Sequence, residues 1–259
     1  MKKKYMVIAG IGFVALIAAI AYFTIVHPHV KMYMQIQRCY QEFSVDGLGM
    51  PASPFTEYSV TDDRFVTVET PDYTISLPAY FTDQTKDGAD IMVYSANSDD
   101  DTQSESAAFG KEGNDSADMA ILNQENLTDA DKKRLMDGYE RLGYGIPDTC
   151  YSSLKCAYLI TEEDYSLLNR NQSMAYTLLV PYRTGAAFFY SDGIRTTYIY
   201  ETDKMHAFIS EFYNSDWGLY IYNVDFYNPE DLNTSYVAII KTKTPQTAYA
   251  IVNSIEFKE

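Results

Sequence analysis

Histidine, cysteine and tryptophan are scarce in this chain. Its 259 residues include three histidines, three cysteines and one tryptophan. The sequence contains no H-E-x-x-H or C-x-x-C spacing for zinc, no G-x-S-x-G turn for a serine nucleophile and no glycine-rich phosphate loop. We therefore name no catalytic residue, metal ligand or cofactor from the sequence, and a domain that is not an enzyme is favoured.

Basic residues are also few, with 20 Lys and Arg against 36 Asp and Glu. Lys2, Lys3 and Lys4 precede the apolar N-terminal segment, so the remainder carries 17 − 36 = −19. Nucleic acid is excluded as an expected partner, because phosphate binding needs a basic stripe. The same charge opposes adsorption to anionic lipid and favours solubility.

Charge is absent altogether from residues 5–26, which read YMVIAGIGFVALIAAIAYFTIV. As a helix rising about 1.5 Å per residue, this segment would span roughly 33 Å, against about 30 Å for a bilayer core. It is either a signal peptide cleaved after Ala19-Ile20-Ala21 or an uncleaved transmembrane signal-anchor. The run exceeds the apolar core of about 7–15 residues typical of signal peptides, so the signal-anchor is favoured.

The flanking charges predict the orientation of this anchor. The three lysines place residues 1–4 in the cytoplasm, because basic flanks stay inside. Lys31 and Arg38 on the other side weaken that bias without reversing it. The expected protein is a single-pass cell-membrane protein with its C-terminal part extracytoplasmic.

Residues 27–63 are expected to form a juxtamembrane stalk and linker. Pro28 predicts an end or a bend in the anchor helix. Residues 29–43 suit a short helix, and the glycines and prolines of residues 44–61 predict irregular structure. The helix would have one partly apolar face, formed by Val30, Tyr33, Met34, Gln37, Tyr40 and Gln41.

Residues 64–259 are expected to form one extracytoplasmic α+β domain. Hairpins dominate the pattern, so the sheet is expected to be mostly antiparallel and flanked by helices. Residues 95–118 are polar and acidic and are expected to be a mobile loop. The turn 191–193 would join two strands as a hairpin. The expected strands are 65–69, 73–77, 91–95, 157–160, 175–181, 186–190, 194–200, 219–226 and 236–241; the expected helices are 128–142, 161–164, 205–212 and 244–255.

The bonding state of the three cysteines is open between two alternatives, both for the pair Cys150 and Cys156 and for Cys39. Cys150 and Cys156 either close a small disulfide loop or remain two packed thiols. Cys39, close to the membrane, is either a free thiol or a bridge between two copies of the chain.

Tyrosine is abundant, with 24 residues. Tyrosine suits strands, and it also dominates surfaces that bind proteins and sugars. We therefore predict a solvent-facing cluster of Trp217, Tyr220 and Tyr222 as the binding site. His206 is expected to be a solvated helix residue.

Two segments that resemble a known family lie at opposite ends of the domain. They are Tyr73-Thr-Ile-Ser-Leu-Pro78 and Ala248-Tyr-Ala-Ile-Val-Asn-Ser-Ile-Glu-Phe257, with the strand and turn 219–231 before the second. Together they resemble the PsbP/Mog1-like α/β/α sandwich, over about a fifth of the chain. The resemblance implies a binding or assembly domain rather than a catalyst. No functional residue of that family maps onto this chain, and the long middle insertion departs from its pattern.

Three functions are consistent with these sequence features. The first is a membrane-anchored, non-catalytic domain that binds a protein or an envelope component. The second is a binder of carbohydrate or cell-wall polymer that uses exposed Tyr and Trp. The third is an envelope hydrolase based on two carboxylates, which would need a suitably spaced pair across a cleft.

Overall fold

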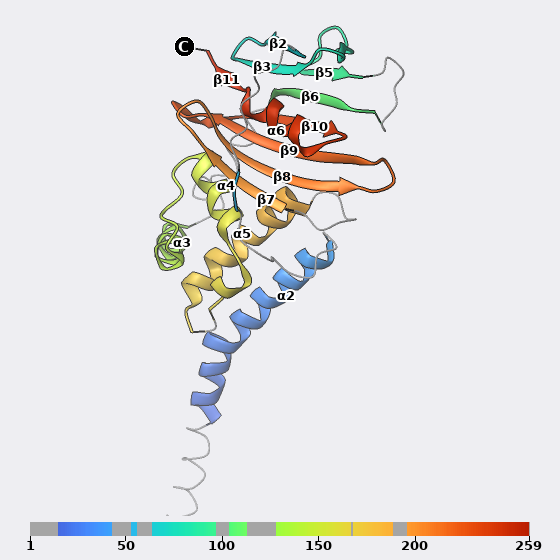
Figure 1. Ribbon diagram of the computed structural model, residues 1–259. Coiled ribbons are helices and arrows are strands. Elements are labelled where there is room, and N and C mark those ends of the chain that lie inside the picture. Colours follow the sequence, from blue (N-terminus) through green and yellow to red (C-terminus); the bar gives the residue numbers. More distant parts are fainter. Residues whose placement is uncertain are drawn as a thin grey trace, which may run out of the picture.

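The computed structural model describes residues 15–42, 53–55, 64–96, 104–112, 128–166, 168–188 and 196–258. These residues form an α+β structure in which antiparallel sheets are flanked by helices, and a long N-terminal helix projects from one side (Figure 1). The expected fold class is confirmed at this level.

The strands form two sheets. The larger has eight strands in the order β1-β7-β8-β9-β10-β6-β5-β4, and the smaller has the order β11-β3-β2. All pairs are antiparallel except β1 with β7. The strands are β1 (Ser53–Pro54), β2 (Phe65–Glu69), β3 (Tyr73–Pro78), β4 (Thr82–Asp83), β5 (Ile91–Ser95), β6 (Ser106–Lys111), β7 (Thr196–Glu201), β8 (His206–Asn214), β9 (Leu219–Asn228), β10 (Asp231–Thr242) and β11 (Glu256–Phe257).

Side-chain caps fix where three of the helices begin. Thr128, Thr149 and Thr244 each accept a hydrogen bond from a backbone N–H in the first turn of the helix that follows. Gly143 ends α3 in the left-handed conformation, with φ of 81°. The helices are η1 (Tyr22–Val26), α2 (His27–Glu42), α3 (Asp129–Leu142), α4 (Cys150–Leu159), η4 (Glu162–Asp164), α5 (Arg170–Phe188) and α6 (Pro245–Asn253).

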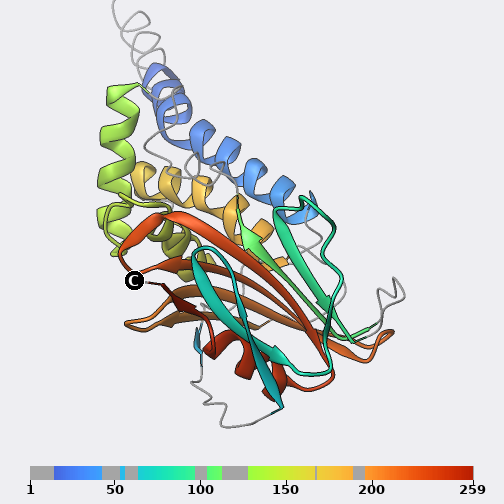
Figure 2. The same cartoon turned by 90° about the horizontal axis from the view of Figure 1, so that it is seen from above.

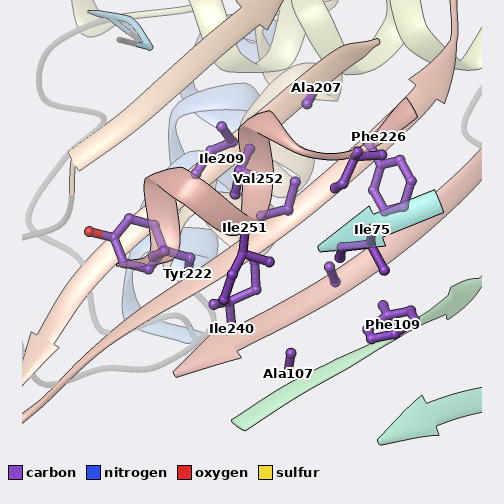
Figure 3. Close-up of a cluster of buried hydrophobic side chains, with 14 of the residues drawn as sticks. Ile75, Ala107, Phe109, Ala207, Ile209, Tyr222, Phe226, Ile240, Ile251 and Val252 are labelled. Carbon is purple, nitrogen blue, oxygen red and sulfur yellow. The ribbon is translucent and has the colours of Figure 1, made fainter. Parts of the chain in front are cut away.

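One face of the larger sheet packs against α6 and the smaller sheet. Ile251 and Val252 of α6 lie between the sheets with Ile75 of β3 (Figure 3). Along β9 the side chains of Tyr222, Val224 and Phe226 point into this core, and Tyr220 packs at its edge.

The other face of the sheet is covered by α4 and α5 where β7, β8 and β9 lie. Phe208 and Tyr227 of the sheet pack there against Tyr158 of α4 and Tyr176 of α5. These helices lie beside β7 and away from β5 and β6 (Figure 1). Within the described residues, helices therefore cover this face over β7, β8, β9 and the start of β10, but not over β5 and β6.

Helix α2 packs against α5 and belongs to the domain rather than to a separate stalk (Figure 2, blue). Its buried residues are His29, Met32 and Ile36. Val30, Tyr33 and Met34, which belong to the predicted partly apolar face, are about half exposed, so this face is not the one that packs into the domain.

Pro28 neither ends the helix nor breaks it. The backbone is helical from residue 15 to Glu42, and residues Tyr22–Val26 form a π-helical turn in which the His27 N–H donates to the Tyr22 carbonyl. A π turn accommodates a proline because it widens the helix where an α-helical hydrogen bond is missing. Among the described residues one helix, Ala15–Arg38, is long and apolar enough to cross a membrane, by length and composition.

Four predicted elements have the wrong type. The predicted strand 157–160 lies in α4, which ends at Leu159, and residues 175–181 and 186–188 belong to α5, so these are not strands. The predicted helix 205–212 is strand β8. β8 has both faces covered, so its apolar residues do not alternate and imitate a helical pattern. The predicted turn 191–193 lies outside the described residues.

Part of the expected mobile loop is a strand. Residues Ser106–Lys111 form β6, which pairs with β10 and β5. Ala107 and Phe109 are fully buried, and these two residues place the segment in the core despite its acidic surroundings. Part of the expected linker is also ordered: Phe55, which follows β1, is buried against the rings of Tyr198 and Tyr249.

Gly138 allows α3 and α5 to approach closely. A Cβ atom at this position would lie 2.3 Å from the Asn171 carbonyl oxygen and 2.9 Å from the Ala175 Cβ. We predict that Gly138→Ala lowers the free energy of unfolding by about 1–3 kcal/mol, because overpacking outweighs the better helix propensity of alanine. Chemical denaturation measures this change. Met136→Ala, on the exposed side of α3, is the control and should change stability by less than about 0.5 kcal/mol; a Gly138→Ala variant as stable as the parent would contradict the close contact.

Candidate functional site

The three predicted binding residues do not form one exposed surface. Tyr222 is fully buried and faces α6. Trp217 and Tyr220 are half-buried at the end of the β8–β9 hairpin. Tyr222 is therefore removed from the predicted site, because alternate residues of β9 point into the α6-side core.

The two remaining aromatic residues lie on opposite sides of the hairpin. The Tyr220 ring contacts the half-exposed Tyr213 ring, with centroids 4.8 Å apart. The Trp217 ring lies 5.0 Å from Lys241 Nζ. Lys241 alternates with the buried Ile240, so its side chain is on the face away from α6. Contact of an ammonium with an indole face is favourable, and burial lowers the pKa of Lys241.

An incompletely covered area of the sheet continues from Trp217 and Lys241. On the same face, β5, β6 and β10 present small and aliphatic side chains that are half-buried or exposed. Ile239, at the centre, is 37% exposed. We call this area the open strand face; its residues are Ile91, Val93, Ala108, Val237 and Ile239.

A separate group of polar side chains joins α4 to the sheet. Tyr151 and Lys155 lie one turn apart on α4, and both bind Glu201 Oε1. Lys155 Nζ is 2.6 Å from this oxygen, and the Tyr151 hydroxyl donates to it. His206 pairs with Glu201 across β7 and β8, and its ring lies 5.0 Å from that of Tyr151. These four residues are the polar cluster.

The ionisation of the polar cluster follows from its surroundings. Burial alone would raise the pKa of Glu201, but the hydrogen bonds from Lys155 and Tyr151 lower it below its usual range. Burial lowers the pKa of His206, and the Glu201 carboxylate only partly opposes this. His206 Nδ1 is buried and has no hydrogen-bond partner among the described residues. The His206 ring is therefore neutral at pH 7, and it lies on a strand instead of the predicted solvated helix.

One carboxyl group outside this cluster has an unusual pKa. Burial raises the pKa of Asp225 to about 7, and the charge of Glu112 adds to the effect. Ser235 Oγ donates to Glu112 Oε2 at 2.8 Å, which holds that carboxylate in place. Asp225 is on β9, with its side chain on the face away from α6. A pKa of about 7 means that the ionisation of Asp225 changes around neutral pH.

The two cysteines of α4 are not joined by a disulfide. Cys150 and Cys156 are both buried. Six residues along an α-helix correspond to a rise of about 9 Å, which exceeds the Cα separation of about 4.4–6.8 Å that a disulfide spans. The disulfide alternative is therefore wrong and the packed-thiol alternative holds. Burial raises the pKa of Cys156 to about 11. Cys39 belongs to α2, and its side chain lies outside the described part.

In the described ranges, no group of three or more His, Cys, Asp or Glu residues could hold a metal ion. A comparison with models of known protein families finds no match, and neither does a search of curated proteins. Sequence reasoning missed the polar cluster, which is built from α4 and from strand ends some 50 residues further along. The spacing of Tyr151 and Lys155 would indicate it only once α4 is known to be a helix.

Glu201 makes the stability of the domain depend on pH in the acidic range. Its folded pKa is depressed below an unfolded value of about 4.3, so its contribution is present above that pH and is lost as the pH falls through the folded pKa. We predict that Glu201→Gln lowers the free energy of unfolding at pH 7, on the order of 0.2–1 kcal/mol because the pair is partly exposed. The difference should shrink at pH 3. Urea denaturation at both pH values measures it.

The matched control for this variant is Glu230→Gln, in the exposed turn between β9 and β10. It should leave stability unchanged at either pH. An equal loss of stability by Glu201→Gln at pH 3 and pH 7 would show that the Glu201 carboxylate charge is not what joins α4 to the sheet.

Proposed function

We propose that this chain is a single-pass membrane protein whose folded domain stands directly on its anchor and binds a protein or an envelope component. One observation carries the proposal: a continuous helix changes its surroundings halfway along. Before His27 its large apolar side chains are exposed, and from His29 onward one face of it is packed into the domain. The exposed apolar residues are Leu16, Ile17, Ile20, Tyr22, Phe23 and Val26.

The proposed orientation is N-terminus inside and domain outside. Three lysines precede the uncharged segment 5–26, and they favour the cytoplasmic side. The domain's charge of 17 − 36 = −19 suits a soluble body outside the cytoplasm that does not adsorb to anionic lipid. Uncleaved attachment is supported by the length of the apolar run, which exceeds the apolar core of about 7–15 residues typical of signal peptides.

The proposed binding surface is the open strand face together with Trp217. This surface combines half-buried aliphatic side chains with the Trp217 ring and the Lys241 ammonium group. Such a composition suits a protein partner, because interface cores combine aliphatic and aromatic groups with few charges. A second copy of the chain, bridged through Cys39, is the alternative protein partner.

Two other functions are less well supported. A carbohydrate site would use exposed aromatic platforms, and only Tyr213, Trp217 and Tyr220 retain exposure near the hairpin end, on two different sides. A carboxylate hydrolase would use Asp225 as its acid, since its pKa of about 7 suits proton donation, with Glu112 as the second carboxylate.

A PsbP/Mog1-like sandwich is proposed as the finer description of the fold. The two segments that suggested it are in contact: Glu256 and Phe257 pair with Thr74 and Tyr73. The hydroxyl group of Ser254 also accepts the Ser76 N–H at 2.8 Å. This contact supports the idea that the two segments form one structural unit.

Removal of residues 1–26 should separate anchoring from folding. The full-length chain should sediment with membranes and resist alkaline extraction, and the truncated chain should be soluble, because the exposed apolar half of the helix is gone. The truncated chain retains α2 and should unfold at nearly the same denaturant concentration. A C-terminal tag should be digested by protease added to intact cells. A soluble full-length chain, or a tag protected on intact cells, would contradict the proposal.

A photo-crosslinking residue at Ile239 tests the proposed binding surface. It should yield one reproducible crosslinked species in cells, because Ile239 lies at the centre of the open strand face. Val66, which is 55% exposed on β2 in the smaller sheet, is the matched control and should yield none. Equal crosslinking from the two positions, or none from Ile239, would exclude this face; glycan products would favour the carbohydrate alternative.

A further inference from the structure

Leu168 is an apolar side chain that the domain holds fully in solvent. It is 100% exposed, in the connection between η4 and α5. The start of α5 lies on the side of the domain from which the N-terminal helix projects (Figure 1). An isolated exposed leucine needs no explanation, so the argument depends on how this one is held and on where it lies.

Hydrogen bonds fix the backbone on both sides of Leu168. Ser166 Oγ accepts the N–H of Leu168 at 3.3 Å and that of Asn169 at 3.2 Å. Asn169 Oδ1 in turn accepts the Gln172 N–H at 3.1 Å and caps α5. The Gln172 amide donates to the Asp164 carbonyl at 2.9 Å. The outward direction of Leu168 is therefore a property of an ordered turn.

A contact with α2 fixes the depth of this turn along the helix. Tyr165 lies against His29, with the Tyr165 hydroxyl 3.3 Å from His29 Nδ1. His29 follows Val26, the last residue of the uncharged segment, by three residues, a rise of about 4.5 Å. The headgroup layer of a bilayer is roughly 5–8 Å thick on each side. If residues 5–26 span the bilayer core, Tyr165 lies at headgroup level.

We propose that Leu168 inserts into the acyl-chain boundary of the same bilayer that holds the N-terminal helix. This inference rests on the proposed membrane anchor and adds a second lipid contact to it. Tyrosine at headgroup level is a familiar feature of membrane interfaces, and it places Tyr165 beside the inserted leucine. The partner is the lipid surface itself, recognised through its apolar chains.

Charge is not part of this contact. Glu162 and Glu163 are exposed just before the turn, and Arg170 is exposed just after it. The acids oppose attraction to anionic headgroups, so insertion should occur equally in zwitterionic lipid. Two contacts, the helix and Leu168, restrict the tilt of the domain, which a single helix leaves free.

The test uses the full-length chain in phosphatidylcholine vesicles. Trp217→Phe removes the single tryptophan, and Leu168→Trp then introduces a reporter at the turn. Val66→Trp in the same background is the control, on a strand of the smaller sheet at the opposite end of the domain (Figure 1). Lipids that carry a spin label near the top of the acyl chain quench tryptophan at this depth.

The expected result is a loss of fluorescence and a blue shift for Leu168→Trp, and neither for Val66→Trp. Thermal unfolding of each variant, compared with the Trp217→Phe parent, verifies the fold. A chain that floats with the vesicles while Leu168→Trp stays unquenched overturns this inference and leaves the anchor intact. A chain that does not float with the vesicles overturns the anchor and this inference together.

Discussion

The docking of α2 against α5 is the contact on which the rest of this structure depends. The same helix exposes bulky apolar side chains before His27 and buries His29, Met32 and Ile36 after it. The first half suits lipid, and the second half is covered by protein. As the proposed anchor, a helix with these two environments would join membrane and domain without a flexible connection, so that the domain would make its contacts at a defined height.

The central sheet explains where a partner has room to bind. One face is occupied by α6 and the smaller sheet, and the other is covered by α4 and α5 over β7, β8, β9 and the start of β10. Among the described residues no helix covers the open strand face on β5, β6 and β10, where Ile239 is the most exposed large residue. The polar cluster at Glu201 marks the border of the covered half, since it attaches α4 to the ends of β7 and β8.

Sequence patterns predicted the elements with local signals. Thr128 and Thr244-Pro245 are helix starts by side-chain capping, and the alternation in Tyr73, Ile75 and Leu77 marks a half-buried strand. The hydrophobic patterns gave the wrong type of element where a strand or helix is buried on more than one side. β8 carries apolar residues on both faces and was expected to be a helix; α5 buries Ala175, Tyr176, Leu179 and Val180, a helical spacing that also fits strands over short windows.

The binding surface was less predictable than the fold. Tyr222 has the same residue type and strand as Tyr220, but it lies under α6, and nothing in its local sequence indicates that cover. The polar cluster and the turn at Leu168 depend on contacts between distant segments, such as Tyr165 with His29, which are 136 residues apart. Local periodicity carries no information about such pairs.

The π-helical turn at Tyr22–Val26 has one further consequence. Each residue of an α-helix turns the chain by about 100°, so a wider turn resets the angular phase between the segments on its two sides. Pro28 and this turn together determine the rotational orientation of the domain about the axis of the N-terminal helix. In the proposed anchored protein, these five residues would therefore determine the direction in which the open strand face points relative to a neighbour in the same bilayer.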